Sequence, residues 1–362
     1  MKPEVLMVAG ARPNFMKIAP VESAIRADGR LRGTIVHTGQ HYDREMSALF
    51  FEQLKIPEPD IHLGVGSASH ARQTAEIMIR LEPVLLERRP ASVLVVGDVN
   101  STVASALVSV KLGIPVAHVE AGLRSLDRSM PEEINRILTD AVSTWLFVSE
   151  KSGIEHLTSE GIDGKKIHFT GNVMIDTLIQ CKKKAEAMDL PGRMGVRPRE
   201  YALLTLHRPS NVDRQAKLAG VMEPIRELSR EMPVIFPAHP RTRKMLREVG
   251  FGDDDRVRVL DPLGYLEFLG LMMHARLVLT DSGGMQEETT VLGVPCVTLR
   301  ENTERPVTIT EGTNRLGGTN PDSIRRAIRD ALGAAPKPRV PELWDGRAAE
   351  RIVEVLAVGL SR

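Results

Sequence analysis

The sequence predicts an α/β protein made of two Rossmann-like, doubly wound domains in tandem. Three observations lead to this prediction. The length of 362 residues suggests two domains at about 150 residues per domain. Short, nearly continuous apolar runs alternate with longer amphipathic stretches, which is typical of a parallel sheet covered on both faces. The alternation then starts again after a Gly-, Pro- and Arg-rich stretch at 188–200.

The elements follow one another in the same order in both halves. In the first half we expect the strands VLMVA, GTIVHT, SVLVVGD, PVAHVE and WLFVS, which start at positions 5, 33, 92, 115 and 145. Between them lie helical patterns at 15–27, 44–54, 71–87 and 101–112. In the second half we expect the strands YALLTL, PVIFPA, RVRVL, RLVLTD and PCVTL, which start at positions 201, 233, 256, 276 and 295.

These elements predict an N-terminal domain at 1–170, a C-terminal domain at 171–345 and a last helix at 346–362. That helix can pack on either domain, including back on the N-terminal one. Two doubly wound domains in tandem predict a cleft between them, faced by the carboxyl ends of both sheets.

Composition excludes several functional classes. Lys and Arg number 48 and Asp and Glu 47, so the net charge is +1, which argues against a nucleic-acid or membrane-surface binder. No apolar stretch is long enough to cross a bilayer, and the apolar run at 5–11 is better explained as a first core strand than as a signal peptide. Cys181 and Cys296 lie far apart and form no zinc spacing. We therefore expect a cytoplasmic protein.

The turn GARPNFMK at 10–17 is suited to a phosphate. A glycine turn that leads into a helix brings Arg12, Lys17 and free backbone N–H groups to one strand end. The segment is neither G-x-G-x-x-G nor a P-loop, so a nicotinamide or ATP site loses support. A solvated Arg and Lys at an ordinary strand–helix turn explain the pattern equally well.

Three carboxylates follow strands or open helices in the first half. Asp98 in GDVNST follows the run SVLVV, although a helix cap would explain it too. Glu120 ends PVAHVE, a costly place for a carboxylate unless it faces a polar cleft. Glu132 opens the helix of PEEINR, together with Glu133, where the helix dipole also favours acidic residues. Asp98, Glu120 and Glu132 could form a cluster suited to acid–base chemistry.

The second half contains a further anion site. His207 and Arg208 in LHRPSNVD follow a strand and suit an anionic leaving group, although a capping loop is the simpler explanation. In DSGGMQEE, at 281–288, the segment 282–284 opens a helix toward a phosphate, and Glu287 and Glu288 can accept hydrogen bonds from ribose hydroxyls. Tight turns and the helix dipole would account for the same residues. His37 and His41 have metal-like spacing, but a strand end and Gly39 intervene, so we predict no metal there.

Taken together, these motifs resemble the non-hydrolysing, bacterial-type UDP-N-acetylglucosamine 2-epimerases. The similar segments run in order from position 10 to 319 and are GARPNFMK, TGQHYD, GDVNST, HVEAGLRS, PEEINR, GNVMIDTL, HRPSN, DSGGMQEE and ENTERPVTITEGTNRLGGT. HVEAGLR, DSGG-x-QEE and TERP in this order are highly specific. The resemblance implies the GT-B architecture and a homodimer that needs no NAD and no obligatory metal or other cofactor.

The resemblance also implies a reaction. The family interconverts UDP-GlcNAc and UDP-ManNAc by eliminating UDP to give 2-acetamidoglucal and adding it back with the opposite configuration at carbon 2, which supplies ManNAc-type sugars for cell-surface polysaccharide. By motif match, the catalytic positions are Asp98, Glu120, Glu132 and His207, and which carboxylate is base and which acid stays open. The positions implied to bind the UDP-sugar are Arg12, Lys17, Arg136, Arg208, Phe268, Ser282, Gly283, Gly284 and Glu288. Phe268 would lie near the uracil, but a core position on an amphipathic helix explains it as well.

The sequence departs from this family at two places. Tyr42 and Asp43 replace part of a Q-H-R-Q-M segment that belongs to a regulatory UDP-GlcNAc site in many members, which puts allosteric activation in doubt. Ser210 stands where those members have a glutamate, and the 124–131 loop is shorter, so the substrate could instead be a modified UDP-GlcNAc. Three further functions are alternatives. A hydrolysing relative that releases ManNAc and UDP differs in water access to the intermediate, which the sequence does not show. The carboxylates together with PEEINR favour the epimerase over a GT-B glycosyltransferase, and a catalytically inactive nucleotide-sugar binding protein would be expected to lack one of the four catalytic positions, none of which is lost.

Overall fold

The computed structural model describes residues 2–39, 57–251, 256–333 and 339–361. The chain forms two compact units, which are described separately. The first unit comprises Met1–Ile179 and Glu342–Arg362, and the second comprises Gln180–Pro341. The expected helix at 44–54 and the expectations for His41, Tyr42 and Asp43 lie outside the described residues.

The first unit contains a seven-stranded parallel sheet in the order β3-β2-β1-β4-β5-β6-β7. Its strands are β1 (Glu4–Ala9), β2 (Arg32–His37), β3 (Ile61–His62), β4 (Ser92–Val96), β5 (Val116–Ala121), β6 (Trp145–Val148) and β7 (Ile167–Phe169). Its helices are α1 (Arg12–Asp28), α3 (His70–Arg88), α4 (Asn100–Lys111), α5 (Pro131–Val142), α6 (Lys151–Ser159), the first part of α7 (Val173–Glu186), and α16 (Ala348–Leu360).

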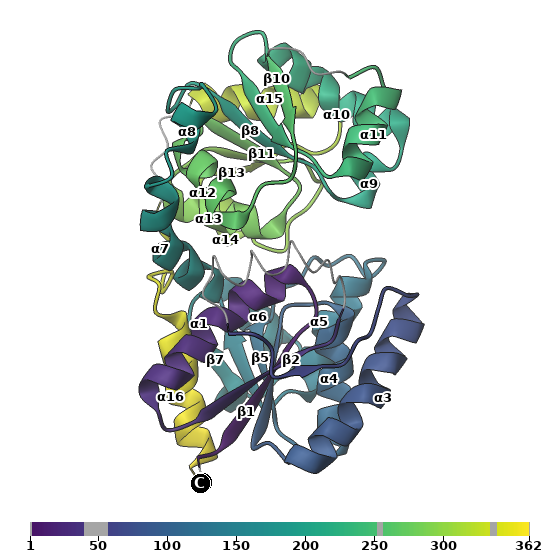
Figure 1. Cartoon of the computed structure of the whole chain (residues 1–362), viewed down its shortest axis with the longest axis vertical. Coiled ribbons are helices and arrows are strands. Elements are labelled where there is room, and N and C mark those ends of the chain that lie inside the picture. Colours follow the sequence, from purple (N-terminus) through teal and green to yellow (C-terminus); the bar gives the residue numbers. More distant parts are fainter. Residues whose placement is uncertain (1, 40–56, 252–255, 334–338, 362) are drawn as a thin grey trace. The chain divides into compact units, whose positions relative to one another are not determined.

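Alternate side chains of β1 explain why this sheet is covered on both faces. Val5 and Met7 pack with α1 and α16 on one face, whereas Leu6 and Val8 pack with α3 and α4 on the other. Figure 1 shows α1 and α16 side by side along the first unit. The strand order reverses between β1 and β4, and ligands bind at the carboxyl ends of strands next to such a reversal.

The second unit contains a six-stranded parallel sheet in the order β10-β9-β8-β11-β12-β13. Its strands are β8 (Ala202–Thr205), β9 (Val234–Pro237), β10 (Val257–Leu260), β11 (Leu277–Thr280), β12 (Cys296–Thr298) and β13 (Asn314–Leu316). Its helices are the last part of α7, α8 (Leu190–Arg193), α9 (Pro209–Val212), α10 (Gln215–Leu228), α11 (Pro240–Glu248), α12 (Tyr265–His274), α13 (Gly283–Leu292), α14 (Val307–Thr310) and α15 (Pro321–Gly333). The apolar faces of α10, α11 and α15 cover one side of this sheet. Its order reverses between β8 and β11, so this unit is also doubly wound.

The boundary between the units differs from the sequence expectation of 170/171 and 345/346. The first half of α7 belongs to the first unit because the Thr177 hydroxyl donates to Met16 O at 2.6 Å. Residues 342–345 also belong to it, since the buried Trp344 indole donates to Ser149 O at 2.8 Å. The helix α16 packs on α1, so the last helix lies on the first unit.

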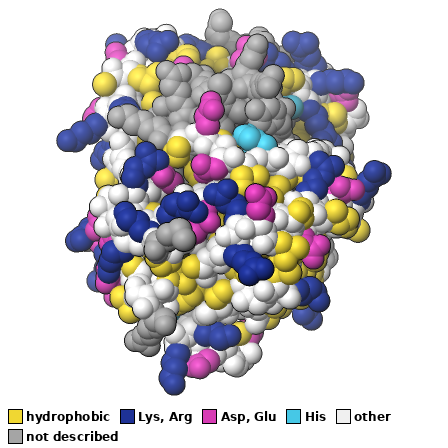
Figure 2. Space-filling view, turned by 60° about the horizontal axis from the view of Figure 1, so that its bottom comes forward, with side chains coloured by type: hydrophobic (Ala, Val, Ile, Leu, Met, Phe, Trp, Pro, Cys, Tyr) yellow, Lys and Arg dark blue, Asp and Glu magenta, His cyan; other side chains and the backbone are white. Residues whose placement is uncertain are grey.

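The surface carries mixed charge. On the face drawn in Figure 2, Lys and Arg side chains are interspersed with acidic and apolar ones. Among the described residues, no helix is long and apolar enough to span a bilayer.

Candidate functional site

In the first unit, the predicted phosphate turn is fixed to the neighbouring strand. Asn14 Oδ1 accepts from the backbone N–H groups of Gly10 and Ala11, at 3.2 and 2.9 Å, and Asn14 Nδ2 donates to Val96 O at 3.2 Å. The turn is therefore held beside the end of β4. Arg12 begins α1, but its side chain is not among those that the structure describes.

Lys17 lies one helical turn farther along α1 and is buried. Its ammonium forms an ion pair with the carboxylate of Glu120. The sequence pattern assigned Lys17 to a phosphate, and in the structure its partner is a predicted catalytic carboxylate.

Glu120 occupies an unusual backbone position. It is the penultimate residue of β5, and the pairing of β5 with β6 shifts register between Val119 and Ala121. Its φ of 75° lies in the left-handed region, which costs a non-glycine residue about 1–3 kcal/mol. Bulges and strained residues of this kind re-aim side chains, often next to active sites.

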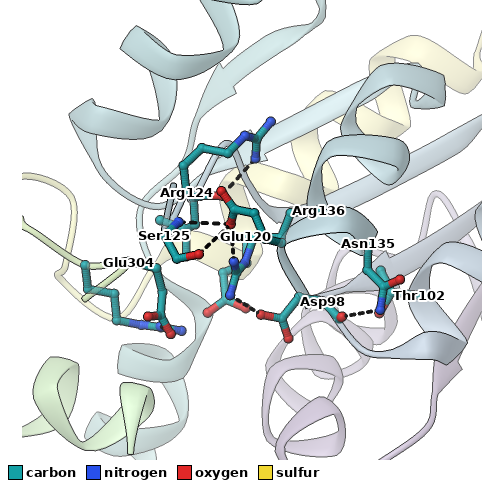
Figure 3. Close-up of polar contacts among 12 residues, drawn as sticks. Asp98, Thr102, Glu120, Arg124, Ser125, Asn135, Arg136 and Glu304 are labelled. Atoms are coloured by element: carbon teal, nitrogen blue, oxygen red, sulfur yellow. Dashed lines mark hydrogen bonds and ion pairs between the residues drawn. The ribbon is translucent and has the colours of Figure 1, made fainter. Parts of the chain in front are cut away.

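Asp98 follows β4, and its side chain does not cap α4. The N-cap residue is Val99, and Asp98 Oδ2 instead lies 2.6 Å from Arg136 Nη2. The carbonyl of Asp98 accepts from Asn135 Nδ2 at 2.9 Å (Figure 3). Two residues of α5 therefore fix the position of Asp98.

The paired glutamates at the start of α5 differ in environment. Glu133 is buried and accepts from Ser125 N, Ser125 Oγ and Leu126 N, and from Arg136 Nη1 at 2.5 Å. Burial alone would raise the pKa of Glu133, but these donors lower it below its ordinary value. Glu132 is only half-buried, in the first turn of α5. Glu133 thus orders the preceding loop and holds Arg136 from the side opposite Asp98.

Gly97 lies beside both Asp98 and the ion pair of Lys17 with Glu120. A side chain at Gly97 would lie 3.1 Å from Lys17 Nζ and 3.2 Å from Glu120 Oε2. Glu120 therefore packs against the residue that precedes Asp98. The structure brings together Asp98, Glu120, Lys17 and Arg136 at the carboxyl ends of β4 and β5.

In the second unit, His207 is oriented by a carboxylate that was not among the predicted site residues. His207 Nδ1 lies 2.7 Å from Oδ1 of the fully buried Asp281, while the imidazole side chain is 61% exposed. Asp281 also accepts from the backbone N–H groups of His207 and Arg208. Burial would raise the pKa of Asp281, but the hydrogen bond and the charge of His207 lower it. A carboxylate on Nδ1 fixes the tautomer and leaves Nε2 for a ligand. The position of Asp281 at a strand end was the signal available in the sequence.

The turn between β11 and α13 is shaped by an arginine. Ser282 is the N-cap residue, and Gly283 and Gly284 begin the helix. A side chain at Gly283 would lie 2.6 Å from Arg305 Nη1. Arg305 Nε lies 2.7 Å from a carboxylate oxygen of Glu287, and Arg305 Nη1 lies 2.7 Å from one of Glu304. The expectation of Glu287 as a ribose acceptor is therefore not supported, because its side chain is buried against Arg305.

The remaining predicted binding residues surround this turn. Arg208 is half-buried, and its Nε donates to Asp281 O at 3.1 Å. Glu288 is buried and accepts from the Tyr265 hydroxyl at 2.8 Å. Burial, together with the negative charge of Glu287, raises the pKa of Glu288 to about 7, although the Tyr265 hydrogen bond acts in the opposite direction. Phe268 is half-buried on α12, one turn after Tyr265.

No metal cluster is found in the part of the chain that the structure describes. His37 packs edge-on against Phe15 and His62, and burial lowers its pKa to about 4. It is therefore a core histidine.

Comparison with known proteins gives a consistent result. The family described as UDP-N-acetylglucosamine 2-epimerase matches residues 23–357. The chain is 42% identical to a UDP-N-acetylglucosamine 2-epimerase of Methanocaldococcus jannaschii, over 98% of both chains. It is also 42% identical to a UDP-2,3-diacetamido-2,3-dideoxy-D-glucuronate 2-epimerase of Pseudomonas aeruginosa, over 98% of this chain and 99% of that one.

A solved structure agrees with both the sequence and the fold. The crystal structure of the M. jannaschii UDP-GlcNAc 2-epimerase in complex with UDP-GlcNAc and UDP has a TM-score of 0.91 and 42% identity, and the match covers 98% of this chain and all of that one. The two doubly wound sheets are those of the GT-B architecture, as the resemblance implied. The chain belongs to the UDP-N-acetylglucosamine 2-epimerase family of isomerases.

Proposed function

We propose that the protein catalyses the reversible epimerisation of UDP-N-acetylglucosamine at carbon 2 to UDP-N-acetylmannosamine. The observation that carries this proposal is the carboxylate cluster of the first unit, in which Asp98 meets Arg136 and Glu120 meets Lys17 at adjacent strand ends. Inversion at carbon 2 needs a proton removed from one face and delivered to the other, and therefore more than one acid–base group.

In the proposed mechanism, a carboxylate takes the carbon 2 proton while the bond between carbon 1 and the diphosphate oxygen breaks. The electrons of the C–H bond form the carbon 1–carbon 2 double bond of 2-acetamidoglucal, and UDP leaves with the electrons of the C–O bond. In the second half, UDP oxygen attacks carbon 1 and a second group protonates carbon 2 on the opposite face. Asp98, Glu120 and Glu132 are the candidate groups. Lys17 and Arg136 orient Glu120 and Asp98.

The second unit supplies the charge stabilisation that a departing diphosphate needs. Arg208, the imidazole of His207 and the first N–H groups of α13 are the donors we assign to the phosphates. Arg12 of the first unit is a further candidate. Glu288 is the candidate acceptor for the ribose hydroxyls, and Phe268 the candidate neighbour of the uracil.

A second substrate is supported by a specific observation. The P. aeruginosa relative, as similar to this chain as the M. jannaschii enzyme, is named for UDP-2,3-diacetamido-2,3-dideoxy-D-glucuronate. Inversion at carbon 2 is the same chemistry in both sugars, so the cluster does not distinguish them. The ratio of kcat/KM for the two UDP-sugars decides which one is the substrate.

The deciding experiment is proton NMR of UDP-GlcNAc with the purified protein in deuterated water. We expect UDP-ManNAc with deuterium at carbon 2. Glu120→Gln should lower kcat by about 10²–10⁴-fold, because the acid–base group is removed while its size is kept. Glu87→Gln, an exposed change on α3, serves as the control.

Three results would contradict the proposal. Free ManNAc together with UDP would identify a hydrolysing enzyme, and transfer to an added acceptor would identify a glycosyltransferase. Undiminished turnover by Glu120→Gln would show that the catalytic assignment is wrong.

We further propose that the enzyme acts as a cytoplasmic homodimer and supplies ManNAc-type sugars for cell-surface polysaccharide. The dimer rests on the family resemblance. Light scattering coupled to size-exclusion chromatography should give about twice the chain mass of 39.9 kDa, and a monomer would contradict it.

A further inference from the structure

A buried histidine lies directly behind the carboxylate cluster. His118 belongs to β5, two residues before Glu120, and its side chain is fully buried. Its Nδ1 lies 2.7 Å from Asp140 Oδ1 on α5, and its Nε2 lies 2.9 Å from the carbonyl oxygen of Gly97. Both ring nitrogens are therefore within hydrogen-bond distance of an oxygen.

Both of these oxygens act as acceptors. A backbone carbonyl has no hydrogen to donate. Asp140 Oδ2 accepts from Gly122 N at 3.1 Å and lies 2.7 Å from Arg124 Nη1, so this carboxylate is already an acceptor on its other side. Burial would raise the pKa of Asp140, but the charges and hydrogen bonds of His118 and Arg124 lower it. A neutral imidazole carries one N–H only and would turn a lone pair toward one of the two oxygens.

The nearest buried charges are those of Arg124 and Asp140, which form an ion pair with each other. Arg124 also pairs with Glu160 at 2.7 Å, but the Glu160 side chain is 36% exposed, so solvent screens this second carboxylate. The two acceptors that face the ring nitrogens are therefore what favours two ring protons.

His118 contacts a residue next to Asp98, and Asp140 contacts a residue close to Glu120. Gly97 precedes Asp98, and its open side faces Lys17 Nζ and Glu120 Oε2. Gly122 follows the bulge that carries Glu120. His118 thus holds the Gly97 peptide, and Asp140 holds the Gly122 N–H beyond the bulge.

We propose that His118 is an imidazolium, paired with Asp140, that serves as the positioning residue for Asp98 and Glu120. It does not touch the substrate. Its two N–H groups fix the Gly97 carbonyl and the Asp140 carboxylate, and these set the path of both strand ends. The inference rests on the roles proposed above for Asp98 and Glu120.

The first test is the protonation state of the ring. In ¹⁵N-histidine-labelled enzyme at pH 7.5, one-bond and long-range ¹⁵N–¹H correlations should show hydrogen on both ring nitrogens of His118. The signal is assigned by its absence from His118→Gln. In Asp140→Asn, which removes the negative charge, we expect a ring with one proton. A single ring proton in the native enzyme would overturn the proposal, whatever the enzyme's activity.

The second test separates positioning from a merely structural role. Asp140→Asn should lower kcat about 10–100-fold, with KM changed less than threefold and UDP affinity unchanged. His168→Gln, a half-buried histidine on β7 of the same sheet, is the matched control and should keep native kcat. A native kcat in Asp140→Asn would overturn the proposal. Failure of the native enzyme to turn over UDP-GlcNAc would instead overturn the proposed function and leave the NMR result standing.

Discussion

At the scale of single residues, the buried carboxylates differ in how well hydrogen bonds and neighbouring charges offset the cost of burying a negative charge. Glu133 and Asp281 accept several hydrogen bonds, and their pKa values are lowered in spite of burial. Glu288 accepts from Tyr265, lies beside the charge of Glu287, and has a pKa raised to about 7. Because the folded protein holds this proton more tightly than the unfolded chain, stability should fall as pH rises from 4.5, the ordinary pKa of a glutamate, through 7.

Glu288→Gln should remove this part of the pH dependence. The raised pKa corresponds to roughly 3 kcal/mol between pH 4.5 and 7. The variant should therefore melt at a higher temperature than the native enzyme at pH 8 and within a few degrees of it at pH 5. Thermal melting followed by circular dichroism at the two pH values is the measurement. If the melting temperature of the variant changed between pH 5 and pH 8 by as much as that of the native enzyme, Glu288 would be excluded as the source of this pH dependence.

Gly283→Ala should impair the β11–α13 turn. The new methyl group would lie 2.6 Å from Arg305 Nη1, and Arg305 cannot move freely because Glu287 and Glu304 hold it. We expect about 1–3 kcal/mol of destabilisation and at least a tenfold loss of UDP affinity by calorimetry. Gly164→Ala has open space around the new methyl group and should bind UDP normally. Native UDP affinity in Gly283→Ala would show that the Arg305 side chain can move to accommodate the methyl group.

Residue types alone could not predict which side chains of the candidate site interact with one another. The sequence identifies Glu132 and Glu133 as a pair, but only the fold shows that Glu133 accepts hydrogen bonds from the backbone N–H groups at 125–126. The ion pair of Lys17 with Glu120 joins positions 103 residues apart, and no local pattern predicts such a contact. Asp281 was visible at a strand end, yet its hydrogen bonds to His207 and Arg208 depend on β8 and β11 being neighbours.

At the scale of elements, periodicity predicts the long helices and the central strands. The two-residue β3 and the three-residue β7 and β13 were not predicted, because edge strands of that length carry too few residues for a pattern. The residues of α7 fall wholly in the predicted C-terminal domain at 171–345, and the sequence predicted no helix at 173–186. The start of α7 is fixed by contacts with Met16 and with residues of α16, which are distant in the sequence.

Asp176 on α7 anchors the last helix. Its carboxylate accepts from Ala348 N at 3.1 Å and Ala349 N at 2.7 Å, the first residues of α16. These N–H groups have no partner within the helix. Asp176→Ala should cost about 1–2 kcal/mol and speed amide hydrogen exchange at the start of α16. Asp330→Ala, exposed on α15, is the control. Unchanged exchange at Ala348 and Ala349 would show that apolar packing alone holds α16.

At the scale of the whole molecule, the proposed reaction divides between groups on two sheets. Parallel strands deliver functional residues at their carboxyl ends, so Asp98 and Glu120 come from the first sheet and His207 and Ser282 from the second. The repeated strand–helix pattern was enough to predict both sheets. It could not predict which carboxylate acts on which face of the sugar, since that depends on how the bulge at Glu120 and the Arg136 contact aim the two side chains.

Isotope exchange in deuterated water should assign those roles. If one carboxylate serves the GlcNAc face and another the ManNAc face, a variant that lacks one of them can still eliminate UDP from the epimer that the remaining carboxylate serves, and can re-form that same epimer. Such a variant should place deuterium at carbon 2 of one UDP-sugar, without epimerising it, and should leave the other unlabelled. Asp98→Asn and Glu120→Gln should therefore differ in which epimer they label. Proton NMR with each UDP-sugar in turn is the measurement. The same labelling pattern in both variants would mean that the two residues act on one face, and Glu132 would then be the candidate for the other.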